Sequence, residues 1–65
     1  MTGPIPARIS ADGRVATWNP ALTRAQRVVL KVRDADGAVS LRASMNSGRA
    51  RVREGETIES VVPAD

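Results

Sequence analysis

The chain lacks cysteine, histidine, tyrosine and phenylalanine, and these absences exclude much of the chemistry that a protein of 65 residues could perform. Without cysteine and histidine there is neither a disulfide framework nor a zinc site of the usual type. Nucleophilic catalysis would need a serine or threonine beside a base, and that base would have to be Lys31 or a carboxylate. No stretch of the sequence arranges such a pair. We therefore expect a non-enzymatic protein with no cofactor, no metal site and no small-molecule substrate.

Long hydrophobic runs are also missing. The sequence has no stretch of about 18 apolar residues, and residues 1–6 show no basic segment followed by a hydrophobic one. These absences predict that the protein has no membrane partner and is not secreted by a signal peptide. The absence of cysteine fits a reducing compartment. We expect a cytoplasmic protein or a component of a virion.

Bulky apolar side chains are scarce. The hydrophobic fraction of 42% includes ten alanines, and Trp18 is the only aromatic residue. Alanine buries little area, so a core made from this inventory leaves little net stability in so short a chain. Disulfides and metals, the usual supplements, are excluded, which leaves contacts within an oligomer or a larger assembly. We predict such a protein partner, with a marginally stable monomer as the alternative.

Arginine dominates the charge that is present. Nine of the ten basic residues are arginine and the net charge is +3. The distribution is uneven, because residues 1–53 carry ten basic and three acidic side chains, whereas residues 54–65 carry four acidic ones and no basic one. A basic body with an acidic end suits head-to-tail contacts between subunits, or an anionic partner.

Three glycines that each follow an acidic residue predict hairpin turns at Asp12-Gly13, Asp36-Gly37 and Glu54-Gly55. Loops over residues 11–13, 34–37 and 53–55 bring apolar side chains of the flanking strands to one face. The pairs that they predict are Ile9 with Val15, Leu30 with Leu41, and Ala50 with Ile58. The second hairpin then has six apolar residues on one face: Val28, Leu30, Val32, Val39, Leu41 and Ala43. In the third hairpin Arg49 lies opposite Glu59 on the outer face.

These patterns predict an all-β fold, a small antiparallel β-barrel or two-sheet sandwich of about six short strands built from three hairpins. Asn19-Pro20 predicts one short helical turn near residues 20–26, since asparagine is a good N-cap and proline suits the first helical position. A longer helix over residues 20–35 is the alternative. The β-branched pair Val28-Val29 favours the strand.

The chain is expected to be a single small domain over residues 1–65. Pro4 and Pro6 predict an extended N-terminal arm, residues 1–6, and Pro63 predicts a C-terminal arm, residues 61–65. Asp34 and Asp36 are paired carboxylates, but both fall in a predicted turn, where aspartate side chains bond to local backbone N–H groups. We assign them to the turn.

Candidate partner-binding residues are the basic side chains on the outer face of the second hairpin, with two from the third, and the lone tryptophan: Trp18, Arg27, Lys31, Arg33, Arg42, Arg49 and Arg51. The arginines could track a phosphate backbone or form the solvated face of a sheet. Trp18 is either a core anchor or an interface residue. The predicted register turns it away from Ile9 and Val15, which favours contact with a partner or the opposing sheet.

The sequence thus favours a structural or assembly protein. The bias towards arginine, alanine, valine and glycine is typical of GC-rich bacterial or bacteriophage genomes. We expect a small accessory virion component of a bacteriophage, such as a capsid decoration or cement protein or a tail protein, stabilised by oligomer or partner contacts. The alternative is a basic β-barrel that binds nucleic acid or the ribosome.

Overall fold

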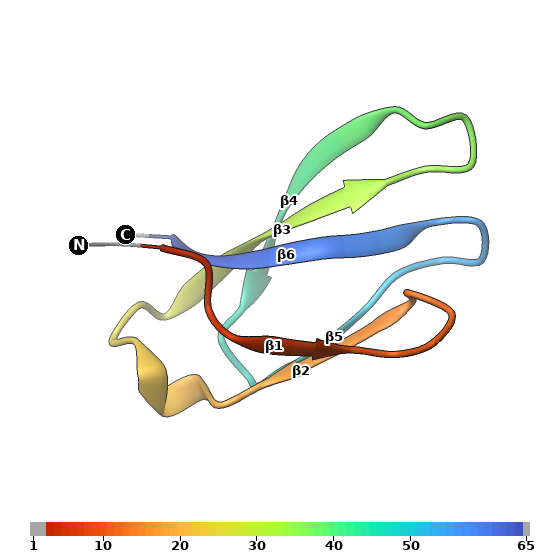
Figure 1. The fold of residues 1–65 in the computed structure, drawn as a ribbon. Coiled ribbons are helices and arrows are strands. Elements are labelled where there is room, and N and C mark those ends of the chain that lie inside the picture. Colours follow the sequence, from red (N-terminus) through yellow and green to blue (C-terminus); the bar gives the residue numbers. More distant parts are fainter. Residues whose placement is uncertain (1–2, 65) are drawn as a thin grey trace.

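Two three-stranded antiparallel sheets form the molecule in the computed structural model, which describes residues 3–64 (Figure 1). The first sheet has the order β1-β2-β5 and the second the order β4-β3-β6. The elements in chain order are β1 (Ala7–Ile9), β2 (Val15–Trp18), the 3-10 turn η1 (Pro20–Leu22), β3 (Arg27–Arg33), β4 (Val39–Met45), β5 (Arg49–Arg51) and β6 (Thr57–Ala64). The all-β prediction is confirmed, and the sheets form an open sandwich and not a closed barrel.

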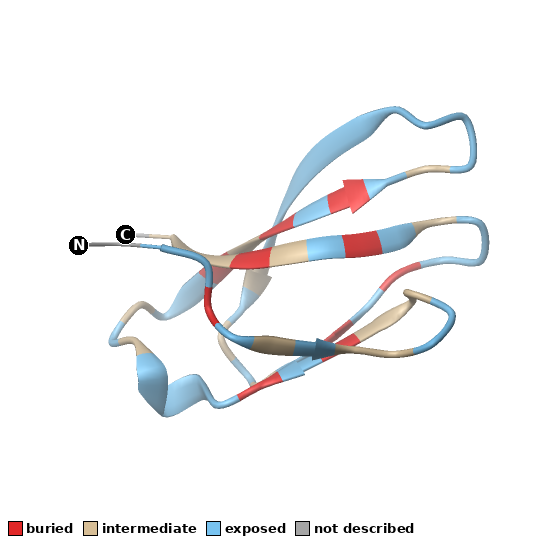
Figure 2. Cartoon of the chain, viewed as in Figure 1, coloured by how far each residue is buried: buried red, intermediate tan, exposed pale blue. Residues whose placement is uncertain are grey.

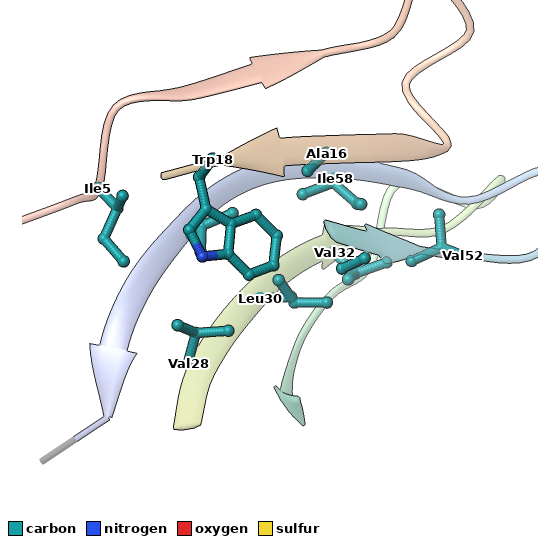
Figure 3. Packing of buried hydrophobic residues seen from close by; sticks show 10 residues of the cluster. Ile5, Ala16, Trp18, Val28, Leu30, Val32, Val52 and Ile58 are labelled. Atoms are coloured by element: carbon teal, nitrogen blue, oxygen red, sulfur yellow. The ribbon is translucent and has the colours of Figure 1, made fainter. Parts of the chain in front are cut away.

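The core lies between the two sheets and follows from the alternation of side chains along each strand. Trp18 projects from β2 towards Val28 and Leu30 of β3 (Figure 3). The residues with the largest fully buried side chains are Val28, Val32 and Val61, all from the second sheet. The remaining buried residues are Ile5, Ala16, Trp18, Leu30, Ala50, Val52 and Ile58. As the composition predicts, this core holds one aromatic ring and otherwise small and branched aliphatic side chains.

The first hairpin joins β1 to β2, but its predicted register is wrong by one residue. Ile9 lies opposite Ala16 and not Val15. The Ser10 hydroxyl donates to the Asp12 carboxylate at 2.6 Å and accepts from the Val15 N–H at 3.0 Å, which lengthens the loop to residues 11–14. The shift turns Ala16 and Trp18 into the core.

The second hairpin joins β3 to β4, and its register is also wrong by one residue. Leu30 lies opposite Arg42, and Arg33 opposite Val39. The cause is the Asp34 carboxylate, which accepts the N–H groups of Asp36 and Ala38, both at 2.9 Å, and so stabilises a connection of residues 34–38. A shift of one residue moves every side chain of a strand to the opposite face. The apolar residues of β4 therefore point outwards.

The third predicted hairpin is wrong as a pairing. A turn does form at Glu54-Gly55, where the Glu56 N–H donates to the Arg53 carbonyl at 3.0 Å. However, it connects the two sheets, because β5 pairs with β2 while β6 pairs with β3. The predicted Arg49–Glu59 pair is therefore wrong as well. β6 has eight residues and β3 has seven, whereas β5 has only three.

The predicted helical turn is present as η1. The Asn19 side chain accepts the Ala21 N–H at 3.0 Å, as an N-cap does. The alternative of a helix over residues 20–35 is wrong, because Arg27–Arg33 is a strand. Within residues 3–64, no helix approaches the length or hydrophobicity that crossing a membrane requires.

The two ends of the described chain lie in the sandwich. Residues 61–64, predicted to form an arm, are instead the end of β6, and Val61 is fully buried. In the predicted N-terminal arm, Ile5 is buried and its N–H donates to the Val61 carbonyl at 2.7 Å. Residues 1, 2 and 65 of the two predicted arms lie outside the described residues.

Candidate interaction surface

β4 carries the large apolar side chains that the fold leaves exposed on its second sheet. Val39 is 44% exposed, Leu41 71% and Met45 63%. All three project from the same, outer face, since they alternate along the strand. None of the seven residues of β4 is buried, and Figure 2 shows the strand pale blue along nearly its whole length. We call the outward-facing residues Val39, Leu41, Ala43 and Met45 the apolar row.

The inner side of β4 is polar. Ser40, Arg42 and Ser44 lie opposite Val32, Leu30 and Val28, the buried residues of β3. β4 thus presents polar groups inwards and apolar groups outwards, the reverse of the usual arrangement in a half-buried sheet. A contiguous exposed apolar surface of this kind marks a protein contact more often than a solvated surface.

β4 is also an edge strand, because β3 is its only neighbour in the sheet. The Asp34 N–H donates to the Ala38 carbonyl and the Asn46 N–H to the Gln26 carbonyl, so the hydrogen-bonded pairs with β3 fall at even-numbered residues. Backbone groups alternate in direction along an antiparallel strand. The N–H and C=O groups of the apolar row therefore point away from the sheet. The Met45 carbonyl is occupied by the Ser47 N–H at 2.9 Å.

Three of the predicted partner-binding residues form ion pairs within the chain. Arg33 Nε lies 2.7 Å from Glu59 Oε2, and Lys31 Nζ lies 3.9 Å from Glu59 Oε1. Arg42 binds Glu56 through both of its terminal nitrogens, with 2.9 Å between Nη1 and Oε1. Their charges are thus largely balanced by Glu56 and Glu59.

These contacts shift the titration of the carboxylates. The hydrogen bonds from Arg42 lower the pKa of Glu56 from its ordinary value of 4.5 to about 2. Hydrogen bonding from Arg33 likewise lowers the pKa of Glu59. Glu56 keeps only 15% of its side-chain surface exposed, whereas Arg42 keeps 43%. The pair joins β4 to the residue that precedes β6.

The other predicted arginines lie elsewhere. Arg27 is exposed at the start of β3, where it lines a shallow hollow with Ala43, Ser44 and Met45. Arg49 and Arg51 lie on the outer face of the first sheet, and Arg49 shares a row with Thr17 and Arg8. Within residues 3–64, neither Arg49 nor Arg51 has an ion-pair partner. The predicted site is therefore divided between two faces of the sandwich.

Trp18 lies in the core and is only 8% exposed. Its indole N–H donates to the Asn46 side-chain oxygen at 2.8 Å. The Asn46 amide in turn donates to the carbonyls of Pro20, at 3.1 Å, and Ala25, at 3.0 Å. This network fastens the loop after β4 to β2 and to the segment around η1. Of its two predicted roles, the structure places Trp18 as a core anchor against the opposing sheet.

The apolar row is the feature that the sequence pattern missed. The signal that could have found it is Asp34, since an aspartate before Ala-Asp-Gly can accept backbone N–H groups two and four residues later. The same contacts confirm that Asp34 serves the turn.

Among the described residues no three acidic side chains gather as a metal site. Comparison with protein-family models, curated proteins and solved structures found no match for this chain.

Proposed function

We propose that the chain is a non-enzymatic structural protein that acts within a protein assembly and contacts that assembly through β4. The observation that supports this most is the apolar row on an uncovered edge strand. Exposed apolar side chains supply the core of a protein interface, and the unpaired backbone groups beside them can extend a sheet. The thin core fits the same function, because a partner would add buried area that the chain alone does not have.

The setting that we propose is the virion of a bacteriophage, in which the chain would be a small accessory component of the capsid or tail. The arginine-rich and alanine-rich composition supports a phage or bacterial origin. A symmetric particle offers many equivalent positions, so a modest contact made by one copy would be repeated around the particle.

The experiment is to purify particles from the source of the chain on a density gradient and to measure the chain in them by quantitative mass spectrometry. We expect a constant ratio of chain to major particle protein across the band. Leu41→Arg should remove the chain from the particles. Leu22→Arg is the matched control, since Leu22 is 55% exposed but lies in η1, outside β4. Absence of the wild-type chain from the particles would contradict the virion proposal.

A second candidate function is binding to nucleic acid, and one observation favours it. The outer face of the first sheet carries Arg8, Arg49 and Arg51 without an ion-pair partner among the described residues. Such a face can bind phosphates, although the only aromatic side chain is buried and offers no stacking platform. The test is binding of labelled RNA and DNA at rising salt.

If this second function holds, log K should fall with log salt by roughly 0.9 for each phosphate contact to a duplex. Replacing Arg8, Arg49 and Arg51 together with alanine should abolish the dependence. Leu41→Arg should not weaken the binding to nucleic acid, since β4 lies in the other sheet. Salt-independent or undetectable binding would remove this candidate.

A further inference from the structure

We propose that the protein which occupies β4 is a second copy of this chain, joined by antiparallel β4–β4 pairing about a two-fold axis at Leu41. This rests on the proposed function, since it names the partner at the surface already assigned. The pairing would join the two second sheets into one continuous sheet with the order β6-β3-β4-β4-β3-β6. Three features of the molecule support this pairing: the other sheet edges are protected, β4 has open backbone groups, and these groups permit a symmetric register.

The other edges of the two sheets are short or covered. β1 and β5 have three residues each. β6 is long, but its Val61 carbonyl accepts from Ile5 and its Ile58 N–H donates to the Gly13 carbonyl, both at 2.7 Å. β6 also carries Pro63 and a register shift opposite Lys31 and Val32. These are devices by which proteins block edge-to-edge pairing. β4 has neither a proline nor a bulge.

The open backbone groups of β4 are both groups of Val39, Leu41 and Ala43, and the N–H of Met45. They lie on the edge away from β3, whereas the Met45 carbonyl is already bonded to Ser47. Two copies can therefore hydrogen-bond only where odd-numbered residues of one face odd-numbered residues of the other. This condition leaves few registers.

One of these registers satisfies both the hydrogen bonds and the charges. With the axis at Leu41, Leu41 faces its own copy and Val39 faces Ala43, so each of these three pairs exchanges two backbone hydrogen bonds. Arg42 then faces Ser40. With the axis at Arg42, the two Arg42 residues would face each other in the pair of closest approach, where like charges are destabilising. That register would also need the occupied Met45 carbonyl.

The side chains fit a symmetric pair equally well. In the Leu41 register the apolar rows of both copies lie side by side on one face, with Leu41 against Leu41 at the centre. On the opposite face, Arg42 keeps its Glu56 partner and meets the small hydroxyl of Ser40. In this register the strand pairs apolar side chains with apolar ones and sets no like charges directly opposite each other. These properties favour a second copy over an unrelated chain.

The first test measures the mass of the purified chain by light scattering over a wide range of protein concentration. We expect the mass of one chain at low concentration and of two chains at high concentration. Leu41→Arg, which places two positive charges at the axis, should keep the chain monomeric throughout. Leu22→Arg should leave the dimer unchanged. A wild-type chain that stays monomeric at every concentration would overturn the proposal.

A second variant guards against a loss of folding. Ala43→Pro removes an N–H that points away from β3, so the single chain should keep its circular dichroism spectrum while the dimer is lost. Ser44→Pro is the control, because its N–H lies in a hydrogen-bonded pair with Val28 and its removal should damage the fold. Retention of the dimer by a folded Ala43→Pro chain would also overturn the proposal.

The register is tested by cross-linking, which the absence of native cysteine makes simple. Across the axis the two Leu41 Cα atoms would lie about 5.5 Å apart, inside the range of roughly 4.4–6.8 Å that a disulfide spans. Leu41→Cys should therefore form a disulfide-linked dimer on mild oxidation. Met45 is 63% exposed, close to the 71% of Leu41, but it would lie far from its own copy, so Met45→Cys should cross-link several-fold less. The reverse order would exclude this register.

The outcomes separate this inference from the proposed function. Suppose that the wild-type chain is monomeric and that Leu41→Arg removes the chain from particles. Then β4 binds another protein, which contradicts pairing with a second copy but supports the assembly function. A β4-linked dimer that is absent from particles would keep the pairing and remove the virion setting.

Discussion

The two edge strands of the second sheet flank the same central strand but meet very different surroundings. β6 directs Ile58 and Val61 into the core, and the β1–β2 loop and the N-terminal segment bond to its outer edge. β4 directs Ser40, Arg42 and Ser44 to the same side and exposes its apolar row. Hence β6 belongs to the core, whereas β4 is held mainly by β3 and by the Arg42–Glu56 pair. A strand can therefore be regular without contributing to the interior.

The largest expected difference in stability is between substitutions of two leucines on neighbouring strands. Leu30→Ala should destabilise the fold by about 2–5 kcal/mol, since it removes buried methyl groups and leaves a cavity. Leu41→Ala, on the exposed row, should change stability by no more than about 0.5 kcal/mol where the chain is monomeric. Urea unfolding followed by tryptophan fluorescence measures both. Equal losses would show that β4 packs as deeply as β3.

The turns at the two edges give the next effect. A Cβ on Gly13 would lie 2.7 Å from Thr57 Cγ2, at the start of β6, whereas a Cβ on Gly37 meets nothing within 4 Å. Both glycines have positive φ, so Gly37→Ala should cost about 1–2 kcal/mol from backbone strain alone.

Gly13→Ala should cost roughly 1–3 kcal/mol more than Gly37→Ala, because Thr57 must also move. Thermal unfolding of the two variants under the same buffer conditions measures the difference. Similar melting temperatures would mean that the first turn does not press on β6.

The smallest effect concerns the ion pair that fastens β4. The folded-state pKa of Glu56 is about 2 and its ordinary value is 4.5, so ionised Glu56 stabilises the fold above pH 4.5. This contribution should fade as the pH falls from 4.5 towards 2, because protonation then favours the unfolded chain. Amide exchange of β4 over this interval measures it.

In Glu56→Gln the acid-dependent loosening of β4 should be weaker, since the titrating group is gone. Glu59→Gln is the matched control, because Glu59 pairs with Arg33 and Lys31 of β3 and not with β4. If the two variants loosen β4 equally, the Arg42–Glu56 pair is not what fastens the strand.

Much of the fold was predictable because its signals are local. Alternating side chains marked the strands, and Asn19-Pro20 marked the 3-10 turn. Register was not predictable from strand pattern alone, since the side chains of Ser10 and Asp34 each lengthen a turn by one residue. The partition of β5 and β6 between the sheets was also hidden, because each pairs with a strand far back in the sequence.

The candidate site was less predictable than the fold for the same reason. Placing β6 beside β3 brings Glu59 to Arg33, a contact that no local pattern encodes. The β3–β4 connection is one residue longer than predicted. Leu41 therefore lies on the surface and not on the same face as Leu30. Arg27, Lys31, Arg33, Arg49 and Arg51 lie on outer faces as predicted, although on two sheets instead of one, whereas Arg42 lies on the inner side of β4.

The Asp34 carboxylate has a consequence well beyond its own turn. By accepting two N–H groups, the carboxylate fixes the length of the β3–β4 connection. That length decides which face of β4 points to the core and which points to solvent. Removing one residue from the connection would shift the register by one, so that the apolar row faced inwards. A single acidic group thereby decides whether the apolar side chains of β4 face the core or the surface.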